Sequence, residues 1–219
     1  PEMALRTDAS SRFGKDHRWG MFWSLGLMWN IKNEPFLKDI EWLTGAQIAL
    51  STGTSGNSEI PYYDHLALVS GGPKYNDEAG IYPKQSGNEE LSWEQTWSNN
   101  IGLRLGFFNR VNLDIDFYHK KTTDMLMSVP ESYAITGEGY RWDNIGAMVN
   151  RGVEVAVNGD IIRTKDFTWN LNANVSYNKN KLVELYNGVQ EYVNSTTGLK
   201  FVVGHPVHEY FLNRYAGVN

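Results

Sequence analysis

The chain of 219 residues contains no cysteine and no long apolar run. Without cysteine, disulfides and thiol catalysis are excluded. The longest apolar stretch, 19–31, is interrupted by glycine, serine and asparagine and is shorter than the ~20 residues that a membrane-spanning helix needs. The net charge of -5, without a cluster of lysine and arginine, argues against a nucleic-acid partner. These absences leave β-sheet architectures open.

The strongest pattern in the chain lies between residues 147 and 185. Apolar and polar residues alternate along 147–163 and again along 167–185, with a short break between them. A period of two and so short a break predict two strands joined as an antiparallel hairpin. The expected apolar face carries Val153, Val155, Val157, Gly159, Ile161, Trp169, Leu171, Ala173, Val175 and Tyr177, and the expected polar face of the first strand carries Glu154, Ala156, Asn158, Asp160 and Ile162.

Strand length separates the two architectures that such a hairpin permits. In a soluble sandwich the apolar face packs on a core, whereas in an outer-membrane barrel it meets lipid and the polar face lines the lumen. Globular strands usually run about 5–6 residues. The strands predicted here run roughly three times as far, as strands do when they cross a bilayer at a tilt. We therefore predict an all-β fold, an antiparallel transmembrane β-barrel.

Five further strands are predicted, at 1–8, 19–31, 42–51, 91–107 and 111–126. Pro35 ends the second of them, and a single helical turn is expected after it. Long loops are expected at 9–18, 52–90, 127–146 and 186–208, on the extracellular side, because outer-membrane barrels have long extracellular loops and short periplasmic turns. The chain would supply a partial barrel of about seven strands, and open edges cannot stand in lipid, so further strands are expected. Near strand ends, an interfacial aromatic girdle is expected to include Trp19, Trp42, Trp93 and Trp169.

The polar faces of these strands are expected to line a wet lumen. Asp114 and Asp116 protrude side by side from one strand, whereas glycosidase carboxylates face each other across a substrate, so we expect no catalysis from them. The expected lumen-lining residues are Asn112, Asp114, Asp116, Glu154, Asn158, Asp160, Asn170, Asn172 and Asn174.

No constellation for catalysis, metal binding or cofactor binding is recognised. His205, His208 and Glu209 are close in sequence, but Pro206 prevents the helix that would bring both histidines onto one face. The chain is therefore expected not to be an enzyme and to need no cofactor.

Two loop clusters are candidates for ligand contact. Aromatic side chains beside amides and acids can hold a sugar by stacking and by hydrogen bonds. The same residue types are enriched at protein interfaces, so packing between loops or against a partner protein remains the alternative. The first cluster consists of Tyr140, Arg141, Trp142, Asp143 and Asn144, and the second of Tyr62, Tyr63, Asp64 and His65.

Several blocks resemble the barrel of the SusC/RagA family of TonB-dependent outer-membrane transporters. They include RTDASSRFG, WSLGLMWNI, LSWEQTWSNNIGLRLGFFNRVNLDIDFYHKKTTDMLM and RYAGVN, and the most specific are NRGVEV and WNLNANVSYNKNKL. The resemblance implies that 1–219 is an internal part of a barrel of roughly 22 strands, without the plug domain, signal peptide and C-terminal strand.

The resemblance also implies a function and its partners. The function would be active import of oligosaccharides or oligopeptides across the outer membrane. The partners would be a SusD-like surface lipoprotein, outer-membrane lipid and, through an N-terminal region that these residues do not include, the TonB inner-membrane complex. Two alternatives stay open: a passive porin and a soluble carbohydrate-binding or glycosidase β-domain.

Overall fold

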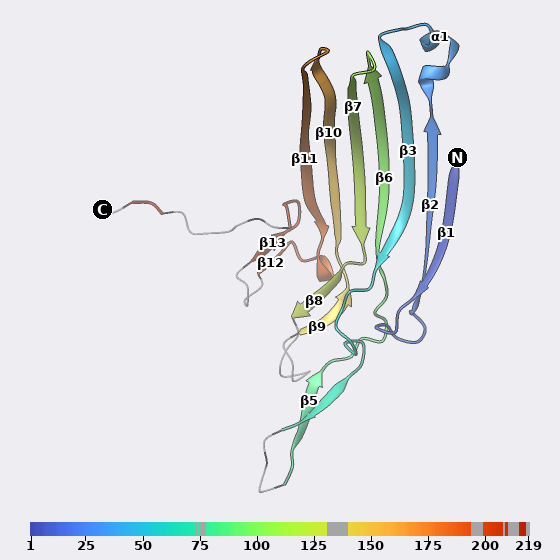
Figure 1. Cartoon of the computed structure of the whole chain (residues 1–219). Helices are drawn as coiled ribbons and strands as arrows, with labels where there is room; N and C mark the ends of the chain where they lie inside the picture. Colours follow the sequence, from blue (N-terminus) through green and yellow to red (C-terminus); the bar gives the residue numbers. More distant parts are fainter. Residues whose placement is uncertain are drawn as a thin grey trace.

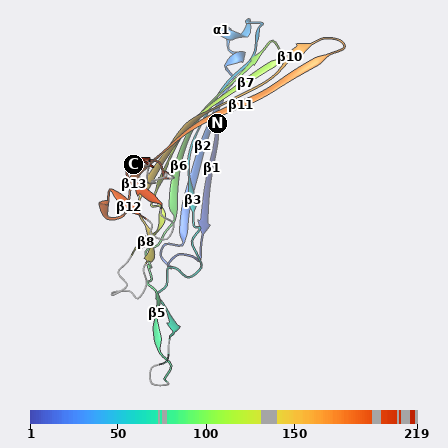
Figure 2. The same ribbon diagram turned by 90° about the vertical axis from the view of Figure 1, so that its left-hand side faces the viewer.

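Seven long strands form one antiparallel sheet in the order β1-β2-β3-β6-β7-β10-β11 (Figure 1). The structure is a computed structural model and describes residues 1–72, 74, 78–130, 140–193, 199–207, 209 and 215–217. The strands are β1 (Glu2–Ala9), β2 (Trp19–Trp29), β3 (Leu43–Asn57), β6 (Glu94–Phe107), β7 (Val111–Thr123), β10 (Ala147–Arg163) and β11 (Thr168–Glu184). The predicted antiparallel all-β architecture is thus confirmed. Seen nearly edge-on, the sheet is a single curved layer (Figure 2).

Three small hairpins extend from one end of this sheet, where the long loops were predicted (Figure 1). They are β4 (Leu68–Gly71) with β5 (Ile81–Gln85), β8 (Leu126–Pro130) with β9 (Tyr140–Asn144), and β12 (Glu191–Val193) with β13 (Lys200–Val202). Three of the four connections predicted as plain loops therefore contain strands of their own. β3 also continues to Asn57, beyond its predicted end at residue 51. We call this end of the sheet the loop end.

The opposite end, the turn end, carries the connections 30–42, 108–110 and 164–167. The first contains η1 (Ile31–Asn33) and the predicted helical turn, α1 (Pro35–Lys38). The ammonium of Lys32 donates hydrogen bonds to the carbonyls of Leu37, Lys38 and Ile40 at 2.8–3.0 Å. This connection is therefore folded on itself although it is the longest at its end. No helix in the described residues is long and apolar enough to cross a membrane.

The register gives the sheet one apolar face and one polar face, because directly paired residues of neighbouring strands point to the same side. One apolar row joins Leu50, Ile101, Phe117, Val153 and Tyr177 across five strands. Their side chains are open to the surroundings, with Ile101 53% and Tyr177 63% exposed. Every other sheet in the described residues has two strands, so no second large sheet covers this face.

The apolar band runs obliquely across the strands. Trp29, the last outward apolar residue of β2, lies in the same register row as Val175 of β11. On β11 the apolar run continues from Val175 to Trp169, about 20 Å further along the strand. The strands β2 and β11 are five strand spacings apart, which is about 24 Å in total. A band level with a membrane therefore requires strands tilted by about 40°, within the range known for outer-membrane barrels.

The small core of the chain lies at the loop end. Phe13, Ile60 and Leu91 are buried there, and Trp93, Leu126 and Trp142 pack against them. The ring of Trp93 packs edge-on against Phe13 at 5.6 Å and Phe22 at 5.4 Å. Trp93 lies next to the start of β6 at Glu94, as predicted, but the girdle position predicted for it is wrong, because its ring packs in the loop core.

The remaining tryptophans of the predicted girdle point outward. Trp19, Trp42 and Trp169 are 73%, 51% and 50% exposed, and Trp42 stacks on Phe107 with ring centroids 6.0 Å apart. They therefore remain available for an interfacial girdle.

A β-bulge near the turn end changes the side to which one residue points. Asp160 pairs with Asn170, but Ile162 pairs with Trp169, so Ile161 is an extra residue in β10. Ile162 therefore shares the apolar face with Trp169, and its predicted place on the polar face is wrong. The bulge inserts one residue into the strand, and a prediction based on a strict period of two cannot detect such an insertion.

Candidate transport surface and mouth

The nine residues predicted to line a lumen occupy one face of the sheet. Asn112, Asn158 and Asn172 form one row, and Asp116 pairs with Glu154 in another. The rows Asp114–Ala156–Asn174 and Asp160–Asn170 complete the set. Their common side follows from the register alone, because these pairs all alternate with the apolar rows.

The amides of this polar face hydrogen-bond to one another. Asn158 donates to Asn172, Asn172 donates to Asn170 at 2.6 Å, and Asn170 donates to the carboxylate of Asp160 at 3.1 Å. Nearer the loop end, Asn180 donates to Asn150 at 2.7 Å. Asn158, Asn172, Asn170 and Asp160 thus form a hydrogen-bonded strip that ends at a carboxylate, and we call these four residues the amide strip.

Two hollows lie on the same face as the amide strip. One, of about 700 Å³, is lined among others by Gln47, Arg104 and Asp114, with Arg104 Nε 4.0 Å from Asp114 Oδ1. The other, of about 540 Å³, is lined by groups that include Asp116 and Lys120. Both hollows offer charges of both signs next to amides, which suits contact with a polar solute and water.

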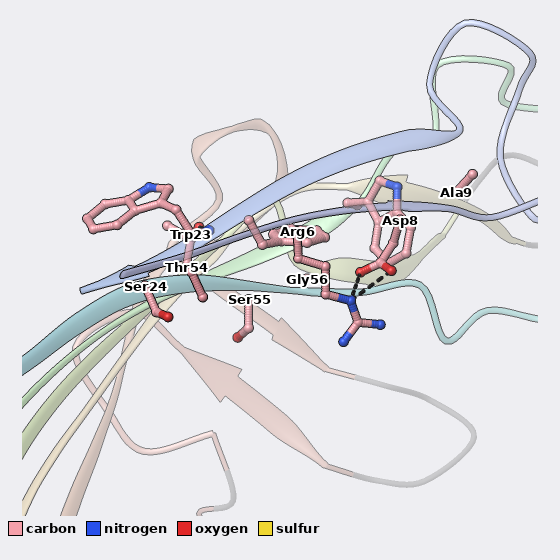
Figure 3. A pocket seen from close by; sticks show the side chains of 11 residues that line it. Arg6, Asp8, Ala9, Trp23, Ser24, Thr54, Ser55 and Gly56 are labelled. Atoms are coloured by element: carbon pink, nitrogen blue, oxygen red, sulfur yellow. Dashed lines mark hydrogen bonds and ion pairs between the residues drawn. The ribbon is translucent and has the colours of Figure 1, made fainter. Parts of the chain in front are cut away.

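A third hollow, of about 520 Å³, lies where β2 and β3 separate (Figure 3). Their pairing ends at Ser24 and Gly53, although both strands continue toward the loop end. Arg6 and Asp8 form an ion pair of 2.7 Å at its wall, and the ring of Phe22 also lines it. The alternation of apolar and polar residues does not predict this hollow, because it results from the separation of two strands.

The first loop cluster is largely engaged in holding the loops together. Asn144 Nδ2 donates to the carbonyls of Ser92 and Asp124 at 2.8 and 3.0 Å, and Asn144 Oδ1 accepts from the Ser92 amide at 2.7 Å. Asn88 Nδ2 donates to the carbonyl of Trp142 at 3.1 Å. Asn144 and Trp142 thus join β9 to the segment before β6.

Two other members of the first cluster are placed differently. Arg141 is exposed and pairs with Asp143 at 3.0 Å. Tyr140 is the first residue of β9, and its side chain lies outside the described part of the structure.

The second loop cluster lies against the first. The side chain of Trp142 hydrogen-bonds to Asp64, and burial raises the pKa of Asp64 above its ordinary value, against the lowering effects of this bond and of His65 and Lys84. Tyr62 and Tyr63 are 69% and 64% exposed. The two clusters are 75 residues apart in the sequence, and the fold brings them together at the loop end. We call residues 62–65 and 140–144 the mouth surface. Whether any of these residues contacts a ligand stays a prediction.

No group of three or more metal-ligating side chains occurs among the described residues. His205 Nδ1 lies 2.7 Å from Glu209 Oε2, and His208 lies outside the described residues.

Residues 2–217 match the family described as "TonB dependent receptor-like, beta-barrel". The chain is 40% identical over 197 residues to the TonB-dependent receptor SusC of Bacteroides thetaiotaomicron, covering 84% of this chain and 19% of that protein. It is 38% identical over 183 residues to the TonB-dependent receptor P39 of Formosa agariphila, covering 83% of this chain and 18% of that protein. The chain thus spans about a fifth of the length of these relatives.

Solved structures agree with the sequence comparison. The "closed-closed" state of the RagAB peptide importer superposes with a TM-score of 0.86 at 38% identity, over 93% of this chain and 22% of that one. The "open-open" state gives a TM-score of 0.85 at the same identity and covers the same shares. The resemblance to SusC and RagA is confirmed, and the seven-stranded sheet corresponds to part of a barrel wall. The chain therefore belongs to the TonB-dependent receptor-like β-barrel family.

Proposed function

We propose that this chain forms part of the wall and mouth of a TonB-dependent importer in the outer membrane. The observation that carries the proposal is the two-faced sheet, with exposed apolar rows on one side and hydrogen-bonded amides and acids on the other. An apolar outer band and a polar interior are what a transmembrane β-barrel requires. The open edges of β1 and β11 require further strands in lipid, because unpaired backbone groups have no water there.

The proposed cargo is an oligosaccharide or an oligopeptide. One solved relative is a peptide importer, which supports the second class. The proposed partners are a SusD-like surface lipoprotein at the loop end, outer-membrane lipid, and the TonB complex acting through a part of the protein beyond residues 1–219. This domain assignment, an internal barrel segment over 1–219, is part of the proposal.

The exposed members of the mouth surface are the proposed ligand contacts. Tyr62 and Tyr63 present most of their surface to the outside, and Arg141 is also exposed. Trp142 and Asn144 are assigned instead to holding the loops. The named relatives are receptors and importers, which supports a transport role without a chemical step.

The experiment uses the complete protein in its own bacterium. Deleting the gene is expected to abolish uptake of one class of oligomer, and an uncoupler is expected to abolish uptake through the intact protein. The passive porin alternative requires uptake that survives the uncoupler. The soluble alternative requires recovery of the protein without detergent, instead of a heat-modifiable band in the outer-membrane fraction.

The proposed mouth contacts are tested in the same strain. Replacing Tyr62 and Tyr63 together by alanine is expected to raise the half-saturating concentration for uptake about tenfold, because stacking on two rings is lost. Phe36→Ala removes an equally exposed ring, 67% accessible, at the turn end and is the matched control. Equal effects of both changes would contradict the proposal that Tyr62 and Tyr63 contact the ligand.

A further inference from the structure

The outward face of the sheet changes from apolar to cationic within one register row. Beyond the row Ile101–Phe117–Val153–Tyr177, the next outward row toward the loop end is Asn99–His119–Arg151–Lys179. The row after that pairs Trp97 with Lys121 and Val149 with Lys181. Neighbouring strands lie about 4.8 Å apart, so three basic side chains stand next to one another across β7, β10 and β11. We call His119, Arg151 and Lys179 of the first row, together with Lys121 of the second, the cationic row.

No ion pair within the described residues involves the cationic row. All four side chains are exposed. Their direct partners in the two outward rows are Asn99, Trp97, Val149 and one another, so no carboxylate faces them there. The positive charges of Lys121, Arg151 and Lys179 are therefore available to an external anion.

An open hollow of about 620 Å³ lies over the boundary between the two kinds of row. Its apolar side is formed by Ile101, Phe117, Val153 and Tyr177, and its polar side by residues that include His119, Arg151 and Lys179. An amphipathic molecule fits such a boundary, with its chain on the apolar side and an acidic head group on the cations.

The other margin of the apolar band differs. At the turn end the outward rows finish with Phe107, Leu171, Ile162 and Trp169, without lysine or arginine. Within the seven long strands, lysine and arginine thus point outward only at the margin beside the long loops. Solvation alone would favour polar residues at both margins of the strands, so the one-sided lysines and arginine favour an anionic partner on the loop side.

We propose that the cationic row binds the phosphate groups of lipids in the membrane leaflet on the loop side, with the acyl chains along Phe117, Val153 and Tyr177. This inference rests on the proposed function, because it requires the apolar face to meet lipid. Guanidinium binds phosphate through two parallel hydrogen bonds, and lysine adds point charges that approach a phosphate from several directions. Arg151, at the centre of the row, is the expected principal contact.

The test measures lipid binding to the complete protein in detergent micelles by native mass spectrometry. The probes are dioleoyl phosphatidic acid, dioleoylglycerol, which has the same chains without phosphate, and inorganic phosphate. One basic residue near a charged membrane surface contributes about a fivefold change in binding. Lys121→Gln is therefore expected to weaken phosphatidic acid binding about fivefold, and the triple change of Lys121, Arg151 and Lys179 to glutamine about a hundredfold.

Lys120→Gln is the matched control. Lys120 precedes Lys121 on β7, carries the same charge and points to the polar face, where it pairs with Asn150. Unchanged lipid binding in this variant, with a loss in Lys121→Gln, supports the inference. Equal losses in both, equal binding of dioleoylglycerol, or binding of inorganic phosphate without preference for the lipid would overturn it.

Fractionation separates this inference from the function on which it rests. If the protein is in the outer-membrane fraction and the triple variant binds phosphatidic acid like the parent, only the lipid site is wrong. If the protein is absent from that fraction, the proposed importer is wrong as well.

Discussion

Placing lysine at Val155 tests which face of the sheet meets lipid. Val155 lies between Ile115 and Val175 in the row next to that of Phe117 and Tyr177. A lysine at the midplane of an outer-membrane barrel costs about 2–4 kcal/mol when it faces lipid. We expect Val155→Lys to lower the free energy of unfolding by this amount.

The position of Val155 determines that magnitude. Arg151 is four residues away on β10, which corresponds to about 13 Å along the strand and about 10 Å along the membrane normal at a tilt of about 40°. A lysine side chain reaches roughly 6 Å from its Cα, so its ammonium cannot arrive at the level of the cationic row. The full cost for a position near the middle of the band is therefore expected.

The control is Ala156→Lys, one residue further along β10 and on the polar face between Asp114 and Asn174. We expect this change to leave stability within about 0.5 kcal/mol of the parent, because the new charge meets water and a carboxylate. The assay is guanidinium unfolding of the complete protein in phospholipid vesicles. The same contrast is expected between Leu171→Lys and Asn172→Lys. Losses of equal size on the two faces would refute the assigned orientation.

Three further changes test the loop end. Asn144→Ala removes three hydrogen bonds and is expected to lower the free energy of opening the β8–β9 hairpin by about 2 kcal/mol, measured by hydrogen exchange. Burial raises the pKa of the Asp64 carboxyl above its ordinary value of 3.8, so the folded protein binds the carboxyl proton more tightly than the unfolded chain does. The free energy of unfolding is therefore expected to fall as the pH rises above 3.8. Asp64→Asn is expected to remove that slope, measured as melting temperature against pH. Gly56→Val would collide with the ring of Phe22 and is expected to cost about 1–3 kcal/mol in thermal unfolding, whereas Gly71→Val meets nothing within 4 Å and serves as its control.

The long strands could be predicted because their sequence repeats one simple signal many times. From Val153 to Val157 and from Leu171 to Tyr177, every second residue is apolar, and the short break at 164–166 leaves only a hairpin as the connection. The same alternation predicts that the nine lumen-lining candidates share one face, and the register agrees. The pairing of the long strands follows their order along the chain, because each long strand pairs with the next long strand and the small hairpins lie between them.

The parts that could not be predicted depend on contacts distant in sequence or on irregular backbone. The bulge beside Ile162 adds one residue at a position that no glycine or proline marks in the sequence. Trp93 reads as a strand-end aromatic, and only its contacts with Phe13 and Phe22 place it in the loop core. The hairpins β4–β5, β8–β9 and β12–β13 are too short to show a period of two against their glycine- and proline-rich surroundings.

The amide strip on β10 and β11 has a consequence for how a solute would travel along it. Asn158, Asn170 and Asn172 already spend part of their hydrogen-bonding capacity on one another and on Asp160. A solute passing along this face would meet amides that are partly occupied with one another. On a transport path such amides would hold a cargo weakly at each step, so a bulky oligomer could move along them without becoming trapped.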